Sequence, residues 1–356
     1  MSGKKEWLEI KTQHWDTADK SNHYDAIKFA ATFLVVLAHA SRMYTGTGVV
    51  IPYNASDGLN HLTNIIYSFH MPIFIFIFGL FFKEKNFLRK IWFYVISSYL
   101  LKGLLCLSWW AITGKTSFRL FYDSGVPWFM FVLAWYTLIA WLFRKVDKRI
   151  VLAISFVIPL VTGYFRAVND FLCFSRMFVF LPFFWLGTMI NPNDLLTAIK
   201  KYRKYLLIPS ACLIAVWLVV CILKIQDVKI LIHLFTGRNP FSSQTNGLGF
   251  LYRILTYAIS FLIGAAILIV VPQRKIPVAS YLGRNTVNVY FWHYTFILII
   301  LRFLNTDTLM KSVWGTVLLL LIAVALTLVL SLDVFNFPLK NINKFIMSFK
   351  KKDGRS

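Results

Sequence analysis

The amino-acid sequence predicts an all-α fold, a polytopic membrane bundle of about ten transmembrane helices with both chain termini in the cytoplasm. Three observations predict it: an apolar composition, apolar runs of membrane-spanning length, and an alternation of basic loops. Of the 356 residues, 58% are hydrophobic and 15% charged, with a mean hydropathy of +0.64. Soluble domains are closer to half apolar and a quarter charged, so the excess of apolar residues belongs in lipid.

The apolar runs define the expected elements, because a helix needs about 20 mainly apolar residues to cross the hydrocarbon core. We expect a cytoplasmic tail at 1–23, a transmembrane domain at 24–335 and a basic cytoplasmic tail at 336–356. The longest expected outer loop, 224–250, leaves no room for an appended soluble domain, so the chemistry must lie among the helices. The expected spans are 25–44, 62–82, 90–110, 127–143, 150–166, 174–190, 205–223, 251–271, 285–303 and 313–333.

The distribution of charge supports this topology. A net charge of +23 could indicate nucleic-acid binding, but the basic residues form short clusters between apolar runs, so we expect no nucleic-acid partner and contact with membrane lipids instead. With the N-terminus inside, the inner segments hold 25 of the 38 Lys and Arg and the outer segments 11, while Lys28 and Lys102 lie within spans. A wrong number of spans would scramble this alternation.

Cysteine and histidine spacing gives no sign of a metal site. Cys106, Cys173, Cys212 and Cys221 lie in or beside apolar segments without a C-x-x-C pair, which favours small core residues over a metal knuckle or disulfide scaffold. The histidines within the spans have no partner at i, i+4 and no nearby carboxylate ligand. We expect no metal and no permanently bound cofactor.

The first span carries four ionisable residues, Asp25, Lys28, His39 and Arg42, around an otherwise apolar run. Ionisable residues inside spans are rare and usually functional. His39 follows Lys28 by 11 positions, about 20° in helical projection, and Arg42 lies about 60° further, so the three share one stripe that should face the bundle interior. Asp25 and Lys28 could simply pair at the inner membrane surface. His39 lies about 16 Å along the helix from Lys28, too deep for easy snorkelling, and its alternative role is a hydrogen-bonded structural histidine.

Other polar residues within spans are weaker candidates. His70 in the second span and His293 in the ninth could carry protons, because imidazole titrates near neutral pH, or could be satisfied core histidines. Lys102 lies about a dozen residues into the third span, where snorkelling is again poor. Arg89 and Lys90 open that span and could hold phosphates, although a basic cluster there is also explained by topology alone.

Five segments occur in order along the chain. They are Tyr24-Asp-Ala-Ile-Lys28 followed by His39, Phe69-His-Met-Pro-Ile-Phe-Ile-Phe-Ile-Phe-Gly79, Pro127-Trp-Phe-Met130, Leu181-Pro-Phe-Phe-Trp-Leu-Gly187 and Gly283-Arg-Asn-Thr-Val-Asn-Val-Tyr-Phe-Trp-His293. Together they resemble the acyltransferase 3 family of membrane acyltransferases, especially its fucose 4-O-acetylase-like branch. The resemblance covers residues 24 to about 300. The sequence differs from many members by Lys28 in place of arginine, and by Asn86-x-x-Arg89 in place of a paired Arg-x-x-Arg.

The resemblance implies an O-acyltransferase in a multi-pass cell membrane, expected to be the bacterial cytoplasmic membrane. It implies acetyl-CoA or another acyl-CoA as cytoplasmic donor, and a hydroxyl of a surface or lipid-linked glycan as acceptor. Esterification needs a base for the hydroxyl and positive charge for the developing oxyanion. We therefore expect His39, Lys28 and Asp25 to be catalytic, with His39 as general base. The expected substrate-binding or donor-binding residues are Arg42, His70, Arg89, Lys90, Lys102, Trp128, Arg176, Asn285 and His293.

Two other functional classes would also place charges inside a helical bundle. A glycan or lipid transporter or flippase often has inverted repeats and corresponding broken helices in its two halves, which this sequence lacks. A structural or sensory membrane subunit would gain nothing from costly interior histidines and lysines. Purified protein that transfers or hydrolyses acyl-CoA would separate the three classes.

Overall fold

The computed structural model describes residues 21–43, 57–123, 125–272, 277–304 and 313–353, and within these ranges the chain is helical, with no β-strand. The predicted all-α fold is confirmed. The α-helices are α2 (Ser21–Met43), α3 (Asp57–Tyr67), α4 (His70–Leu80), α5 (Phe87–Thr113), α6 (Trp128–Leu142), α7 (Lys148–Thr162), α8 (Phe174–Met189), α9 (Pro192–Leu223), α10 (Ile225–Phe235), α11 (Gly249–Val270), α12 (Pro277–Arg284), α13 (Thr286–Phe303), α15 (Val313–Leu330) and α16 (Leu339–Asp353). Two 3-10 turns, η1 (Asn246–Leu248) and η2 (Asp333–Asn336), complete the described elements.

Five stretches of the described chain are long and apolar enough to cross a membrane, which supports a multi-pass membrane protein. Several other helices are apolar but shorter, so the number ten is not confirmed and, like the position of the termini, stays a prediction. The long stretches are His23–Ser41, His61–Leu80, Phe87–Thr113, Pro192–Leu223 and Gly249–Val270, and the shorter ones are Trp128–Leu142, Phe174–Met189, Thr286–Ile300 and Val317–Leu330.

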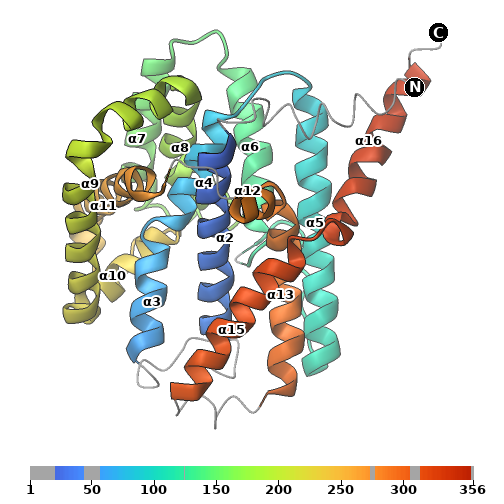
Figure 1. Cartoon of the computed structure of the whole chain (residues 1–356). Helices are drawn as coiled ribbons and strands as arrows, with labels where there is room; N and C mark the ends of the chain where they lie inside the picture. The colour runs from blue at the N-terminus through green and yellow to red at the C-terminus, as the bar shows by residue number, and fades with distance from the viewer. Residues whose placement is uncertain (1–20, 44–56, 124, 273–276, 305–312, 354–356) are drawn as a thin grey trace.

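Helix α2 runs through the centre of the bundle (Figure 1) and packs against α3, α4, α12, α13 and α15. Its small and apolar positions Val36, Ala38 and Ala40 are buried. This position explains why α2 can hold ionisable residues that a lipid-facing helix could not, because its polar side chains face other helices rather than hydrocarbon.

The predicted second span is two helices, α3 and α4, separated at Ser68 and Phe69. The Ser68 carbonyl oxygen accepts a hydrogen bond from Ser260 Oγ at 2.6 Å, and Ser68 Oγ accepts one from Trp217 Nε1 at 2.9 Å. A break in a membrane helix frees backbone groups that must be satisfied internally. Side chains of α9 and α11 supply partners here.

Helices α4 and α8 cross at glycines. A Cβ atom added to Gly79 would lie 2.1 Å from the Phe184 carbonyl oxygen, and one added to Gly187 would lie 2.3 Å from the Phe76 carbonyl oxygen. Small residues allow membrane helices to approach backbone to backbone. The two glycines therefore set the spacing of this crossing.

The segment after α5 turns back along that helix instead of staying at its end. Ser98 Oγ, about halfway along α5, donates to the Pro127 carbonyl oxygen at 3.0 Å, and α6 begins at that level. The segment also contacts the 163–173 connection, where Leu172 N donates to the Phe121 carbonyl oxygen at 2.7 Å and Tyr122 forms an isolated bridge with Phe171. Non-helical backbone at membrane depth occurs where it is covered by protein or lines a cavity.

The predicted C-terminal tail contains a packed helix. Leu339, Ile342 and Ile346 of α16 join the apolar cluster that includes Leu101 and Leu105 of α5. Figure 1 shows α16 beside α5 and diverging from the bundle toward its C-terminal end. The start of α16 therefore belongs to the body of the protein, while the cytoplasmic location of the segment stays a prediction.

Candidate active site

Two histidines from distant parts of the chain meet inside the bundle. His39 on α2 and His293 on α13 are 254 residues apart, yet His39 Nδ1 lies 2.8 Å from His293 Nε2. Their rings are nearly parallel, with centroids 5.1 Å apart and an interplanar angle of 15°. The Tyr294 ring packs edge-on against His39. The sequence identifies each histidine as a separate candidate, and only the fold shows that the two are in contact.

The hydrogen-bond partners assign the tautomers of this pair. His293 Nδ1 lies 2.9 Å from the Val289 carbonyl oxygen and 2.8 Å from that of Tyr290. A carbonyl oxygen only accepts, so His293 Nδ1 carries the proton and the neutral ring accepts at Nε2. His39 Nδ1–H is then the donor to His293, and the lone pair of His39 belongs to Nε2. The basic atom of the pair is therefore His39 Nε2.

Burial distinguishes the two rings. His293 has no exposed surface, whereas His39 is half-buried. Of the two rings, only His39 is therefore open to contact with another molecule. A histidine that acts as a base is commonly held in one orientation by a second group, and His293 could hold His39 in this way.

Asp25 and Lys28 form a buried ion pair, with 2.6 Å between Lys28 Nζ and Asp25 Oδ1. Helix α12 packs directly on this turn, because a Cβ atom added to Gly283 would lie 2.0 Å from the Asp25 carbonyl oxygen. By helical rise, Lys28 lies about 16 Å along α2 from His39. The pair is thus outside contact range of the His39 ring.

His70 lies on the first turn of α4 and is buried. Its Nδ1 is 2.7 Å from the Ile66 carbonyl oxygen, and its ring packs edge-on against Tyr67. Since the carbonyl only accepts, His70 Nδ1 is the protonated nitrogen of its neutral ring. His70 thus bridges the break between α3 and α4.

Asn285 connects α12 to the end of α15. Its Nδ2 donates to the Ser331 carbonyl oxygen at 2.8 Å and to Asp333 Oδ1 at 3.3 Å. These contacts engage the amide within the protein, and a role in substrate binding stays a prediction. Arg42 belongs to the last turn of α2, and its side chain lies outside the described residues.

Arg89 and Lys90 lie on the first turn of α5, and their place on the inner side of the membrane stays a prediction. Lys90 Nζ donates to the Lys83 carbonyl oxygen and lies 5.1 Å from the centroid of the Phe82 ring. Asn86 precedes the helix with a φ of 59°, a left-handed conformation that Asn adopts more readily than most residues. The left-handed backbone conformation therefore explains why an asparagine stands at position 86.

The side chains of Trp128 and Arg176 are in contact. The Arg176 guanidinium lies 4.9 Å from the Trp128 ring centroid, within cation–π range. Arg176 Nη1 is 2.9 Å from the Asp123 carbonyl oxygen and 3.3 Å from Asp170 Oδ1, and Nε donates to the Thr236 carbonyl oxygen at 3.3 Å. One buried guanidinium thus joins the segments that precede α6 and α8 and follow α10.

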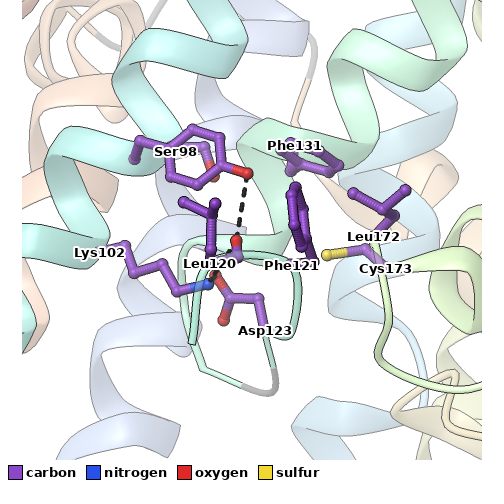
Figure 2. Close-up of a pocket in the computed structure, with 9 residues that line it drawn as sticks. Ser98, Lys102, Leu120, Phe121, Asp123, Phe131, Leu172 and Cys173 are labelled. Atoms are coloured by element: carbon purple, nitrogen blue, oxygen red, sulfur yellow. Dashed lines mark hydrogen bonds and ion pairs between the residues drawn. The ribbon is translucent and has the colours of Figure 1, made fainter. Parts of the chain in front are cut away.

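Lys102 meets the returning segment after α5, as Figure 2 shows. Its Nζ donates to the Tyr122 carbonyl oxygen at 2.7 Å and to that of Leu120 at 3.4 Å, and lies 4.0 Å from Asp123 Oδ2. A shallow hollow that is partly open to the surface borders this contact. It is lined by Ser98, Tyr99, Lys102, Leu120, Phe121, Asp123, Phe131, Leu172 and Cys173.

Burial raises the pKa of Asp123 to about 6. The Lys102 ammonium, the Gly125 N–H and the Arg176 guanidinium oppose this shift, and the Asp170 carboxylate adds to it. Burial has the largest effect because the charged carboxylate loses more solvation free energy than its interactions with these partners restore. Asp123 therefore changes charge near pH 6.

Sequence reasoning missed three buried or partly buried charges, Asp123, Asp170 and Arg253. All three fall in or next to predicted outer loops and so resemble topology signals. Arg253 is fully buried, and its Nη1 donates to the Leu234 carbonyl oxygen at 2.7 Å. Its Nη2 lies 3.3 Å from Asn239 Oδ1. Arg253 thus satisfies carbonyl groups at the end of α10.

Comparison with known proteins gives one result. The model of a family described as acyltransferase domain matches residues 22–335. No curated protein and no solved structure matches the chain. The matched range runs from the start of α2 to η2 and so contains both histidines, the Lys102 hollow and the Asp25–Lys28 pair. Within the residues that the structure describes, no three His, Cys, Asp or Glu side chains form a potential metal site.

Proposed function

The chain belongs to the acyltransferase 3 family, and from this premise we propose that it moves an acetyl group from acetyl-CoA to a hydroxyl of a surface or lipid-linked glycan. The observation that carries the proposal is the 2.8 Å contact between His39 and His293, which makes His39 Nε2 basic in a family that esterifies hydroxyls. The fucose 4-O-acetylase-like motifs favour a sugar as acceptor.

The proposed reaction has two steps at His39. Nε2 removes the acceptor hydroxyl proton as the oxygen attacks the thioester carbonyl carbon, which forms a tetrahedral intermediate. The intermediate then collapses, the carbon–sulfur bond breaks, and the protonated Nε2 returns its proton to the leaving CoA thiolate. General acid–base catalysis by a positioned histidine typically contributes about 10² to 10⁴ in rate.

His293 supports both steps as a positioning residue. While Nε2 of His39 holds the proton, its Nδ1–H keeps donating to His293 Nε2, so the cationic ring gains a charge-assisted hydrogen bond that the neutral ring has only in weaker form. This difference favours the transition state over the ground state. The Val289 and Tyr290 carbonyl oxygens keep His293 in the tautomer that accepts this bond.

The proposed topology has ten spans and cytoplasmic termini in a bacterial cytoplasmic membrane. Arg89 and Lys90 then open α5 on the cytoplasmic side, where the CoA phosphates would bind through charge-assisted hydrogen bonds. His39 lies toward the outer end of α2, which favours an outward-facing acceptor. Lys28 and Asp25 lie on the inner half of the same helix and would contribute to the donor side.

The direct test uses the purified full chain with acetyl-labelled acetyl-CoA and methyl glucoside, methyl galactoside and methyl fucoside as acceptors. We expect label in an O-acetyl ester and release of one CoA per ester. His39→Ala should lower ester formation about 10² to 10⁴-fold at unchanged yield of folded protein. A wild-type chain that neither transfers nor hydrolyses the acetyl group would refute the proposed function.

A further inference from the structure

Helix α9 presents a long apolar face to the surroundings of the protein. Of the five long apolar stretches in the described chain, that of α9 is the least buried inside the protein, at 11%. Figure 1 shows α9 at the edge of the bundle. Ile208, Val216, Val219 and Leu223 are exposed along its length. Because the chain is a multi-pass membrane protein, this face lies against the acyl chains of lipids.

The length of α9 places its basic residues at the level of the lipid headgroups. The part from Tyr205 to Leu223 contains no charged residue and rises about 27 Å, close to the thickness of about 30 Å of the hydrocarbon core. Lys200 lies five residues before Tyr205, or about 7.5 Å along the axis. The headgroup region on each side of the core is about 5 to 8 Å thick. The basic turn therefore lies among headgroups, whichever end of α9 is cytoplasmic.

One basic residue of this turn faces the protein. At about 100° per residue, Arg203 projects in the same direction as Ser210 and Cys221, which are both buried. Arg203 Nε donates to the Ile269 carbonyl oxygen at 3.0 Å, and Nη2 donates to that of Val270 at 3.1 Å. Arg203 thus satisfies carbonyl groups at the C-terminal end of α11, which no longer have partners within that helix.

The other three basic residues, Lys200, Lys201 and Lys204, are exposed on a different face. Relative to Lys200, Lys204 and Lys201 project at about 40° and 100° around the helix. Ile208 and Leu223 project at about 80° and 140°. The three ammonium groups therefore lie directly beyond the stripe of α9 that contacts acyl chains. Basic residues that serve only to set topology have no preferred direction around a helix.

The three ammonium groups form a cluster of like charge. Within the part of the chain that the structure describes, none of them forms an ion pair with a carboxylate. Lys204 follows Lys200 by four positions and Lys201 by three, the spacings at which like charges repel. A phosphate that accepts hydrogen bonds from two neighbouring ammonium groups relieves this repulsion.

Two tyrosines complete the surface. Lys201 Nζ lies 5.2 Å from the centroid of the Tyr202 ring, and Lys204 Nζ lies 4.7 Å from that of Tyr205. Both rings are exposed, and tyrosine is enriched at the headgroup level of membrane proteins. The surface thus combines cations, interfacial aromatic rings and an apolar stripe in the order in which a phospholipid presents its phosphate, glycerol and acyl chains.

We propose that α9 binds one anionic phospholipid, whose phosphate is held by Lys204 together with Lys200 or Lys201 and whose acyl chains lie along the face from Ile208 to Leu223. A zwitterionic phospholipid carries a cation beside its phosphate, which the lysine cluster repels, so the surface selects a headgroup of net negative charge. This inference concerns lipid binding and does not rest on the proposed acyl transfer.

The test compares phosphatidylglycerol with phosphatidylcholine, each carrying the same acyl chains and the same fluorophore on one chain. Binding of each lipid to the purified full chain in neutral detergent is followed by fluorescence anisotropy, and the ratio of the two apparent Kd values measures headgroup preference. The α9 variant replaces all three lysines by glutamine, a good helix former at exposed positions. A matched control removes the same charge from three exposed lysines elsewhere. The α9 changes are Lys200→Gln, Lys201→Gln and Lys204→Gln, and the control changes are Lys83→Gln, Lys85→Gln and Lys145→Gln.

The wild type should bind phosphatidylglycerol about fivefold or more tightly than phosphatidylcholine, the preference that one ammonium near an anionic lipid confers. The α9 variant should reduce this ratio to about twofold or less, and the control variant should keep it. Binding of phosphatidylcholine should be similar in all three proteins because the apolar face is unchanged. The wild-type preference should also fall in molar salt, where the screening length is only about 3 Å.

Four results would overturn the proposal. They are equal affinity of the wild type for the two lipids, an unchanged preference in the α9 variant, and a loss of preference as large in the control variant, which would make overall charge the cause. The fourth is displacement of phosphatidylglycerol by millimolar glycerol 3-phosphate, which would assign the lysines to a soluble phosphate instead of a lipid.

Discussion

Replacement of His293 by phenylalanine tests the role of the histidine pair. Phenylalanine keeps a planar ring in a fully buried position but offers no acceptor to His39 Nδ1–H, which now lies 2.8 Å from His293 Nε2. A hydrogen bond to a charged group contributes about 1.5 to 3 kcal/mol, against about 0.5 to 1.5 for a neutral one. Because the neutral hydrogen bond is also lost in the ground state, only the difference of about 1 to 1.5 kcal/mol affects turnover, and we expect turnover to fall about 5- to 13-fold.

Rescue by a second variant separates positioning from packing. His293→Gln places an amide oxygen near the former Nε2 and can accept from His39, so turnover should recover to within about twofold of wild type. The assay is acetyl-CoA hydrolysis at saturating donor, with donor affinity measured in parallel by equilibrium binding. Equal losses in the Phe and Gln variants, or no loss in either, would show that His293 does not act through an accepted hydrogen bond.

Three further predictions concern the helix crossing, Asp123 and the topology. Gly187→Ala should lower thermal stability markedly, because its Cβ would lie 2.3 Å from a backbone oxygen, while Gly103→Ala, with no atom within 4 Å, should not; equal melting temperatures would contradict the close crossing. Because burial raises the pKa of Asp123 to about 6, the folded chain holds this proton more tightly than the unfolded chain, so the contribution of Asp123 to thermal stability should fall as pH rises through 6, and the Asp123→Asn variant should lack this contribution. In a chain freed of its natural cysteines, Lys115→Cys should react with an impermeant reagent from outside intact cells and Asp147→Cys should not, and the reverse pattern would refute the ten-span topology.

Much of the fold follows from the sequence because apolar runs and helix-breaking loops are local signals. The runs that contain α5 and α11 are found with boundary errors of three residues or fewer, since burial in lipid needs no long-range information. Helix α9 begins at Pro192, 13 residues before the predicted span 205–223, because its first turns carry the basic cluster that the sequence assigns to an inner loop. The break between α3 and α4 was not foreseen. It depends on Ser260 and Trp217, which satisfy Ser68 from other helices, and no local pattern encodes such contacts.

In the candidate site, too, single residues can be predicted from the sequence but their contacts cannot. His39, His293 and Lys102 stand out singly, because an ionisable residue within an apolar run is a local anomaly. The pairing of the two histidines depends on the packing of α13 against α2 and is not visible in spacing. Asp123 cannot be singled out from the sequence because a carboxylate is an ordinary residue in a loop. It gains a partly buried partner, Lys102, only because its segment returns along α5.

The central claim, that His39 Nε2 is the general base, is tested most directly by turnover of His39→Gln with acetyl-CoA binding measured on the same preparation. Glutamine keeps a hydrogen-bonding side chain of similar reach but cannot take up a proton near neutral pH. The account predicts that turnover falls about 10² to 10⁴-fold while donor affinity stays within about twofold, since CoA binding is assigned to Arg89 and Lys90. Near-normal turnover in His39→Gln would contradict the account and make His39 a scaffold residue.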